Sequence, residues 1–445
     1  MFFGVLVALS TEILGLFSLL SRISILIFWS CIIGIYFINF FIHVDSASVA
    51  EYKKKILQKP SLFLEISLLL ILLATFFVAI MYPPNTWDSM TYHMSRVMHW
   101  IQNQNVDFYE TPDTRQLFSG PFSEYVILHL QLLTNGDYLA NLVQWFSMFS
   151  SLIVVSLIAK EFGGVKNAQL LSAFFCATIP MGILQSSSTQ TDYVVSLWIV
   201  MVAYFLTRYL NTNNFKYIFG FAVALSLGIL TKSTTYIFAF PFCVWLFLYI
   251  VKKNRPHFFG LLIVPAIILL LNFGHFSRNY NLFENPLGIH PENLQVTNEK
   301  FNFPVTMSNV LRNLSLNLAV PSKTVNEKTS NIIIKILESF ELSVEKPMNT
   351  FGGEFYIPFS FYESTAPNSS HFFILILVIF LLIARRKLTR LSCFYLLSIV
   401  AGFFLFSLIL KWQPYGNRLM LPLFVLLSSF VGFSLNRLGS KILSF

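Results

Sequence analysis

The sequence predicts an all-α integral membrane protein with about twelve transmembrane helices and two extracytoplasmic loop regions that carry amphipathic helices. Three observations predict this class. Of the 445 residues, 55% are apolar and 11% are charged, whereas soluble globular chains carry roughly 25% charged residues. Apolar runs of about 20 residues, the length that a helix needs to cross a bilayer, recur along the chain. Basic residues cluster between these runs and form no basic domain, which argues against nucleic-acid binding.

The apolar runs give twelve expected transmembrane helices. They cover residues 2–20, 23–43, 61–81, 138–159, 167–184, 191–209, 216–231, 234–251, 258–276, 371–384, 391–410 and 419–436. The N-terminus lacks the basic segment and cleavage site of a signal peptide, so the first run is expected to remain as a helix. The cysteines lie inside apolar runs without a CxxC neighbour, which indicates small core residues rather than disulfide or metal partners. They are Cys31, Cys176, Cys243 and Cys393.

The distribution of Lys and Arg predicts the orientation of these helices. With the N-terminus in the cytoplasm, the short cytoplasmic connections hold more than half of the 30 basic residues, and the other side holds most of the 21 acidic residues. We therefore divide the chain into four parts. They are an N-terminal helix pair with a basic cytoplasmic linker (1–60), a transmembrane core (61–277) that includes the first external loop (82–137), an external loop region (278–370) and C-terminal transmembrane helices (371–445).

The two external segments are expected to contain helices of their own. Residues 122–133 are typical of an amphipathic helix that lies on the membrane, and residues 308–342 show apolar positions at helical spacing. Residues 351–358 are expected to be irregular and aromatic. We therefore expect no soluble domain with a separate core.

Polar chemistry first arises directly after the third apolar run, where a Pro-Pro pair ends the helix at the water boundary. On the helix expected to follow, Asp88, Tyr92, Ser95 and His99 recur at i, i+4, i+7 and i+11, so they are expected to share one face. That face would bring an acid, a phenol, a hydroxyl and an imidazole to the membrane surface. The alternative is an interfacial helix whose Trp and Tyr anchor it at headgroup level, a role that does not need Asp88.

Further polar residues lie on the same predicted side of the membrane. Asp192 opens an apolar run, where an acid can cap the helix or contact a substrate. Lys232 lies in a tight turn, where it can reach membrane lipid phosphates or bind one specific phosphate. Arg418 lies at the outer mouth of the last run, against the positive-inside trend, and its planar fork suits phosphate, although interface anchoring is the alternative. Glu363 is a candidate second acid or a solvated loop residue.

These residues, in this order and on this side of the membrane, resemble the GT-C membrane glycosyltransferases. The closer likeness is to the protein-mannosyltransferase and aminoarabinose-transferase branch, including the RgtA-to-D-like domain. The motifs that carry it are Asn85-Thr86-Trp87-Asp88 with Tyr92-His93, Thr191-Asp192, Thr231-Lys232-Ser233 and Tyr415-Gly416-Asn417-Arg418-Leu419. The likeness spans roughly residues 62–438, and the first two runs look like an addition before the usual first helix.

The resemblance implies an enzyme that takes a sugar from a polyprenyl-phosphate carrier and works on the extracytoplasmic side of a bacterial plasma membrane. It implies Asp88 as the general base and Lys232, Arg278 or Arg418 as ligands of the lipid phosphate. The remaining expected substrate contacts are Tyr92, His93, Arg96, His99, Asp192 and Glu363. Family members often carry a paired acid at the first-loop site, but here Ser89 follows Asp88. This departure favours a mechanism without a divalent metal, and no cofactor is predicted.

The chemistry of these residue types agrees with that expectation. A single carboxylate can remove the proton of an attacking hydroxyl, and Arg or Lys can stabilise a departing phosphate. Direct displacement would invert the anomeric carbon, whereas retention needs a second carboxylate, for which Glu363 is the candidate. We therefore expect an inverting glycosyltransferase that acts on a lipid, polysaccharide or protein, with Asp88 and Arg418 in one cavity. The alternatives are a non-catalytic scaffold and a transporter or flippase of a lipid-linked sugar, which should show internal repeats and polar groups at mid-membrane.

Overall fold

A computed structural model describes residues 1–43, 61–253, 255–290, 295–342, 348–385 and 388–439. Within these residues, 8 helices are long and apolar enough to cross a membrane, which supports the predicted integral membrane, multi-pass architecture. They are α2 (Arg22–His43), α4 (Leu62–Met81), α8 (Leu142–Glu161), α11 (Asp192–Thr212), α13 (Thr234–Lys253), α14 (Gly260–Phe283), α18 (Arg390–Ile409) and α20 (Leu421–Gly439). Shorter apolar helices are α1 (Phe2–Leu16), α12 (Lys216–Thr231) and α17 (Ser369–Ala384).

The predicted number of twelve transmembrane helices is not confirmed, because the run at 167–184 does not form one continuous helix. It is divided into α9 (Lys166–Ala177) and α10 (Pro180–Gln185). Pro180 occupies the first turn of α10, where its missing N–H costs nothing and its fixed φ favours a new helix start. A 12-residue helix is only about 18 Å long, so α9 alone is too short to cross a bilayer.

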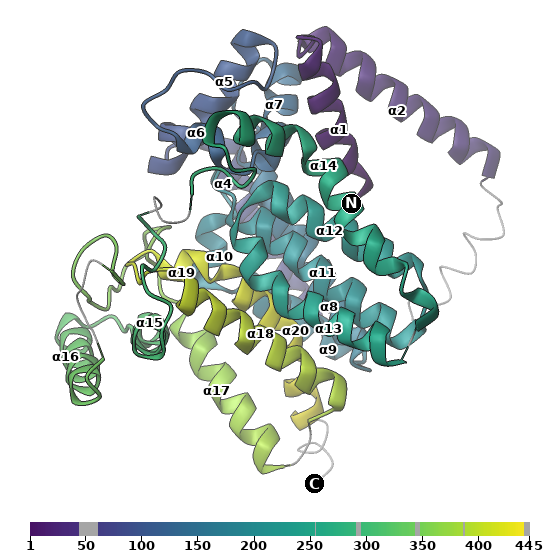
Figure 1. Cartoon of the computed structure of the whole chain (residues 1–445). Helices are drawn as coiled ribbons and strands as arrows, with labels where there is room; N and C mark the ends of the chain where they lie inside the picture. The colour runs from purple at the N-terminus through teal and green to yellow at the C-terminus, as the bar shows by residue number, and fades with distance from the viewer. Residues whose placement is uncertain (44–60, 254, 291–294, 343–347, 386–387, 440–445) are drawn as a thin grey trace.

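The core of the bundle is formed by α11 and α20, which pack against each other and against α8, α9, α12 and α13 (Figure 1). In the apolar stretches of α11 and α20, 72% and 83% of the residues are buried, compared with 6% in α2 and 11% in α4. The Leu, Ile and Phe side chains that cover α2 and α4 are therefore available to face lipid, whereas α11 and α20 are enclosed by protein.

The first external region folds into one turn of π-helix, η1 (Ser89–His93), followed by α5 (Met94–Asn103), α6 (Arg115–Phe118) and α7 (Phe122–Thr134). The prediction that 122–133 lies on the membrane as an amphipathic helix is wrong. Of the 13 residues of α7, 10 are buried, because the helix is covered by α1, α2, α5 and α12 (Figure 1). Consequently α7 is a structural core for this region rather than an interface anchor.

The second external region contains α15 (Phe303–Ser315), a 3₁₀ turn η4 (Leu316–Leu318) and α16 (Lys323–Ser339), which agrees with the helical spacing predicted there. Asn302 caps α15 by accepting a hydrogen bond from the backbone N–H of Val305 at 3.0 Å. The strand pairing among the described residues consists of two isolated bridges, Thr297 with Leu410 and Thr350 with Trp412. These bridges fix the segment that leads into α19 (Gly416–Leu419), the short helix that carries Arg418.

Candidate functional site

Four helix ends bring charged side chains to the same end of the bundle. Asp88 immediately precedes η1, Asp192 is the first residue of α11, Lys232 follows the last residue of α12, and Arg418 lies in α19. Each of these positions is a point where a helix stops or starts, so the side chains project beyond the apolar packing of the bundle. The structure therefore brings together residues that are up to 330 positions apart in the sequence.

Arg418 joins two carboxylates. Its Nη1 donates to Oδ2 of Asp88 at 2.7 Å, and its Nε lies 3.7 Å from Oδ2 of Asp192. On the far side of Asp192, Nζ of Lys232 donates to Oδ1 at 2.7 Å. Acids and bases thus alternate along the cluster, and the Arg418 side chain is only 15% exposed. Each carboxylate is held in place by a cation, as buried charges require.

Arg115, at the start of α6, is a site residue that the sequence analysis missed. Its Nη1 lies 3.8 Å from Oδ1 of Asp88, and its guanidinium lies 4.6 Å from the centre of the Tyr92 ring. Asp113 orients it through a bidentate pair, with Nη2 donating to Oδ2 at 2.7 Å and Nε donating to Oδ1 at 2.9 Å. Because its side chain is 44% exposed, Arg115 is the most accessible cation of this cluster. The Asp-x-Arg spacing at 113–115 was its only signal.

Two opposing effects determine the pKa of Asp88. Burial alone would raise it, but the Arg418 guanidinium, followed by His93 and Lys232, holds the pKa of Asp88 below its usual value. The neighbouring Tyr92 shows the opposite result, because burial and then the Asp88 charge raise the pKa of its phenol well above 10. At neutral pH the site therefore contains an ionised Asp88 beside a neutral Tyr92.

One oxygen of Asp88 and one nitrogen of Arg418 have no hydrogen-bond partner among the described residues. Oδ2 of Asp88 is bound by Arg418, whereas Oδ1 has only the Arg115 guanidinium near it, at 3.8 Å. Nε of Arg418 is buried and makes no hydrogen bond. A buried N–H without a partner is costly, so this donor is available to an incoming acceptor.

Neutral polar residues fix the positions of the two acids. Thr189 donates from Oγ1 to Oγ of Ser89 at 2.6 Å, which ties the start of η1 to the segment before α11. Oε1 of Gln144 on α8 accepts from the backbone N–H groups of Tyr193 and Val194 at 2.6 and 3.1 Å. These contacts satisfy donors in the first turn of α11 and so hold Asp192 at its end.

Three of the expected substrate contacts in the 83–100 stretch have partners within the external region, although the His93 ring also lies 4.1 Å from the Tyr92 ring. Nδ1 of His93 lies 2.8 Å from Oε1 of the buried Glu124 on α7, at hydrogen-bond distance. Arg96 contacts the same oxygen at 3.4 Å, and its Nη2 donates to the carbonyls of Leu117 and Ser119, each at 2.7 Å. These residues hold the external region together.

His99 and Ser95 do not share the Asp88 face either. The His99 ring stacks on Tyr109 with the ring centres 4.0 Å apart, and Ser95 donates back to the carbonyl of Met90. The physical reason is the π-helical turn, which closes with longer-range hydrogen bonds than an α-helix and so rotates the following residues out of the predicted register.

Arg278 is engaged elsewhere. Its Nη1 and Nη2 donate to the two carboxylate oxygens of Glu12 at 2.8 and 2.7 Å, and Nη2 also donates to Tyr125 at 2.9 Å. The bidentate pair with Glu12 uses the two terminal nitrogens of the Arg278 guanidinium, the group that the sequence analysis expected to bind a lipid phosphate. The pair also explains why an acid, Glu12, lies inside the first apolar run: its contact with Arg278 attaches α1 to α14.

Glu363 lies at the edge of the charged cluster. Its backbone carbonyl accepts from Nε2 of buried Gln185 at 2.7 Å, which fixes the loop before α17. The pKa of the adjacent Tyr362 is raised first by the Glu363 carboxylate, then by burial, and further by the Asp88 charge. Glu363 and Asp88 thus both act on the charge state of Tyr362. Among the described residues, no group of three or more His, Cys, Asp or Glu side chains is placed to hold a metal ion.

Comparisons with known proteins agree with this architecture. A family model described as dolichyl-phosphate-mannose-protein mannosyltransferase matches residues 119–271. The solved structure of ArnT from Cupriavidus metallidurans bound to undecaprenyl phosphate is similar with a TM-score of 0.57 and 15% sequence identity, over 84% of this chain and 60% of that chain. The apo structure of the same protein gives 0.56 and 16%, over 84% and 59%. This chain therefore spans about 60% of the length of the structures it matches.

The predicted resemblance to GT-C membrane glycosyltransferases is confirmed by these matches, and so is the predicted all-α membrane fold. No curated protein sequence matches this chain significantly.

Proposed function

We propose that this protein is a membrane glycosyltransferase that transfers one sugar from a polyprenyl-phosphate-linked donor to a hydroxyl of a lipid, polysaccharide or protein acceptor. The observation that carries the proposal is the pairing of Asp88, which has one carboxylate oxygen without a hydrogen bond, with Arg418, a buried cation that has one donor without a partner. The proposal is also supported by the similarity to an aminoarabinose transferase that binds undecaprenyl phosphate. One group can accept a proton while the other binds an anion at the same site.

Asp88 acts as the general base. The acceptor hydroxyl attacks the anomeric carbon and its proton passes to Oδ1 of Asp88, the oxygen without a hydrogen bond. The new carbon–oxygen bond forms as the bond from the anomeric carbon to the phosphate oxygen breaks, and the electron pair leaves with the phosphate. A positioned base of this kind contributes about 10²- to 10⁴-fold to the rate.

Arg418 and Lys232 stabilise the departing polyprenyl phosphate, and Arg115 guides it from the accessible side of the cluster. The leaving group is a stable anion, so it needs cations rather than a general acid. Nε of Arg418 supplies a donor that already lacks a partner. Arg278 has no part in this step, because Glu12 holds its guanidinium.

The displacement inverts the anomeric carbon. Retention would require a second carboxylate free to attack the sugar. Asp192 is near, but Lys232 donates to Oδ1 at 2.7 Å, and the Arg418 guanidinium lies 3.7 Å from Oδ2. It serves as an anchor that orients the two cations. We place the site on the extracytoplasmic side of a bacterial plasma membrane. The distribution of Lys and Arg supports the side, and the likeness to ArnT supports the membrane.

The test is transfer by purified Asp88→Asn protein supplied with a polyprenyl-phosphate sugar and a hydroxyl acceptor. We expect kcat to fall by at least about 100-fold, with donor binding retained because Arg418 and Lys232 remain. Asp137→Asn, an exposed acid in the same external region, is the matched control and should transfer at the wild-type rate. Transfer by Asp88→Asn within threefold of wild type would exclude Asp88 as the base.

A further inference from the structure

An apolar groove runs along the outside of the bundle between α13 and α18. It has a volume of about 660 Å³ and is lined chiefly by Phe240, Val244, Trp245, Leu397, Ala401 and Leu405. Pro241 lies on its α13 wall, and Thr306 of α15 lies at one end. Because the two helices belong to the membrane-spanning set, this groove opens towards the lipid hydrocarbon.

The groove continues into a second cavity of about 510 Å³ that is basic at its far end. Trp245, Leu248 and Phe394 line both cavities, so the two adjoin along α13 and α18. The second is lined at its end by Lys252 and Lys253, the last residues of α13, and by Arg390, the first residue of α18. An apolar channel therefore leads into a site with three positive charges.

These three cations form no ion pair within the described parts of the chain. Lys252, Lys253 and Arg390 are all exposed, and no carboxylate lines the cavity. The closest acid that contacts a lining residue is Glu161, which accepts from Asn211 at 2.9 Å. Arg208 already neutralises it at 2.7 Å. The positive charge at this end of the groove is consequently unbalanced.

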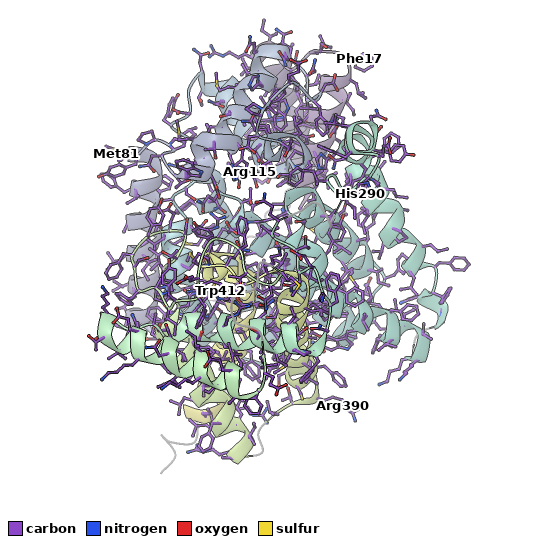
Figure 2. All side chains as sticks on the ribbon, turned by 60° about the vertical axis from the view of Figure 1, so that its left-hand side comes forward. Phe17, Met81, Arg115, His290, Arg390 and Trp412 are labelled. Atoms are coloured by element: carbon purple, nitrogen blue, oxygen red, sulfur yellow. The ribbon has the colours of Figure 1, made fainter. Side chains whose placement is uncertain are left out.

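The basic end lies far from the proposed catalytic cluster. Lys232 immediately precedes the α13 region, whereas Lys252 and Lys253 end it, and a helix of 20 residues spans about 30 Å. In Figure 2 Arg390 lies near the lower edge of the molecule, well below Arg115. A headgroup bound at Arg390 is therefore not the donor phosphate.

We propose that this groove binds one anionic glycerophospholipid of the phosphatidylglycerol class, with an acyl chain between α13 and α18 and the phosphate at Lys252, Lys253 and Arg390. Basic pockets between transmembrane helices recognise anionic headgroups in this way. Tyr249 lies one turn before Lys253 at the end of α13, a position typical of amphipathic rings that meet headgroups, and its ring lies 6.0 Å from Nζ of Lys253. The site is independent of the transfer reaction.

The experiment measures lipid binding to delipidated, detergent-purified protein by native mass spectrometry, with phosphatidylglycerol and phosphatidylcholine as probes. We expect one phosphatidylglycerol to bind in preference to phosphatidylcholine, and K252Q/K253Q/R390Q to weaken it by about tenfold or more. The matched control, K323Q/K328Q/K335Q, removes three exposed charges from α16 and should change nothing. Equal losses in the two triple variants would overturn the proposal.

A second variant tests the apolar part and leaves the charges intact, which guards against misfolding of the triple variant. Ala401 is exposed and lines the groove, so Ala401→Trp should fill it and weaken phosphatidylglycerol binding by about the same factor. If Ala401→Trp binds phosphatidylglycerol as tightly as wild type, the lipid is held by surface charge alone, and the proposal that its acyl chain occupies the groove is refuted. Displacement of the lipid by glycerol 3-phosphate at equal concentration would identify a free-phosphate site, and displacement by polyprenyl phosphate would identify a donor groove; either result overturns the proposal.

Discussion

Replacing Glu12 by Gln should destabilise this protein strongly. Glu12 lies in α1, outside the charged cluster around Asp88, so the effect is expected on stability rather than on catalysis. Glu12 and Arg278 are 15% and 13% exposed and are joined by two hydrogen bonds of 2.8 and 2.7 Å. Removing one partner leaves the other charge buried and unpaired, which costs about 3–5 kcal/mol. For a chain of 445 residues that corresponds to a fall of about 3–5 °C in apparent Tm.

The assay is thermal unfolding followed by tryptophan fluorescence in one detergent at one scan rate. Glu65→Gln is the matched control, since Glu65 also lies in a membrane helix but its contact with Lys166 spans 4.0 Å, with both side chains 40% exposed. Such a pair contributes at most about 1 kcal/mol. Gly274→Ala provides a variant without charge change, because the added methyl group would collide with the Glu12 carboxylate.

Two results would refute this reasoning. The first is a Tm for Glu12→Gln equal to that of Glu65→Gln, which would mean that the Glu12–Arg278 pair contributes no more than a surface contact. The second concerns function, because Arg278→Gln should lower Tm but leave the KM for the donor within a few fold of wild type at a permissive temperature. A large rise in that KM would restore Arg278 as a phosphate ligand.

Three further outcomes follow from the site. The acid limb of kcat/KM, which reports the free enzyme, should lie below the ordinary Asp range, because Arg418 lowers the pKa of Asp88. The acid limb of kcat, which reports the enzyme with donor bound, should lie at higher pH. The bound phosphate interacts with Arg418, so Arg418 lowers the pKa of Asp88 less than in the free enzyme. Acid limbs at the same pH in the two profiles would contradict this explanation. Glu124→Gln should lower the unfolding free energy by about 3–5 kcal/mol in denaturant titrations, because it leaves two buried basic side chains without their carboxylate. Gly120→Ala should reduce both Tm and transfer, since its methyl group would lie 2.7 Å from the backbone carbon of Thr231 at the end of α12; wild-type values would show that this helix end can move freely.

Residues at helix ends were predictable because hydropathy locates them directly. Asp88, Asp192, Lys232 and Arg418 each follow or precede an apolar run, and the assumption that the runs alternate across the membrane places all four on one side. The structure adds the contact between Arg418 and Asp88 at 2.7 Å, which the sequence analysis expected only as a shared cavity.

Other features were not accessible because they depend on backbone geometry that periodicity does not encode. The π-helical turn at Ser89–His93 rotates the residues after it, so the α-helical projection that grouped Ser95 and His99 with Asp88 does not hold. His93 and Arg96 were expected to contact the substrate, but both contact Glu124. Their partner Glu124 lies on a helix that the apolar pattern placed on the membrane surface. The break before Pro180 was missed because a window of hydropathy averages across a single proline.

The charged cluster is most simply understood as a resting state in which Arg418 is shared. Without donor, the Arg418 guanidinium donates a hydrogen bond to Asp88 and lies 3.7 Å from Asp192. Its Nε is buried and has no hydrogen-bond partner. A phosphate oxygen that meets Nε removes this penalty and draws positive charge away from Asp88. In the proposed mechanism, the exchange that binds the leaving group therefore also raises the basicity of Asp88, the proposed base. In this arrangement donor binding and base activation depend on one side chain, which explains why a base would be paired so closely with a cation that weakens it.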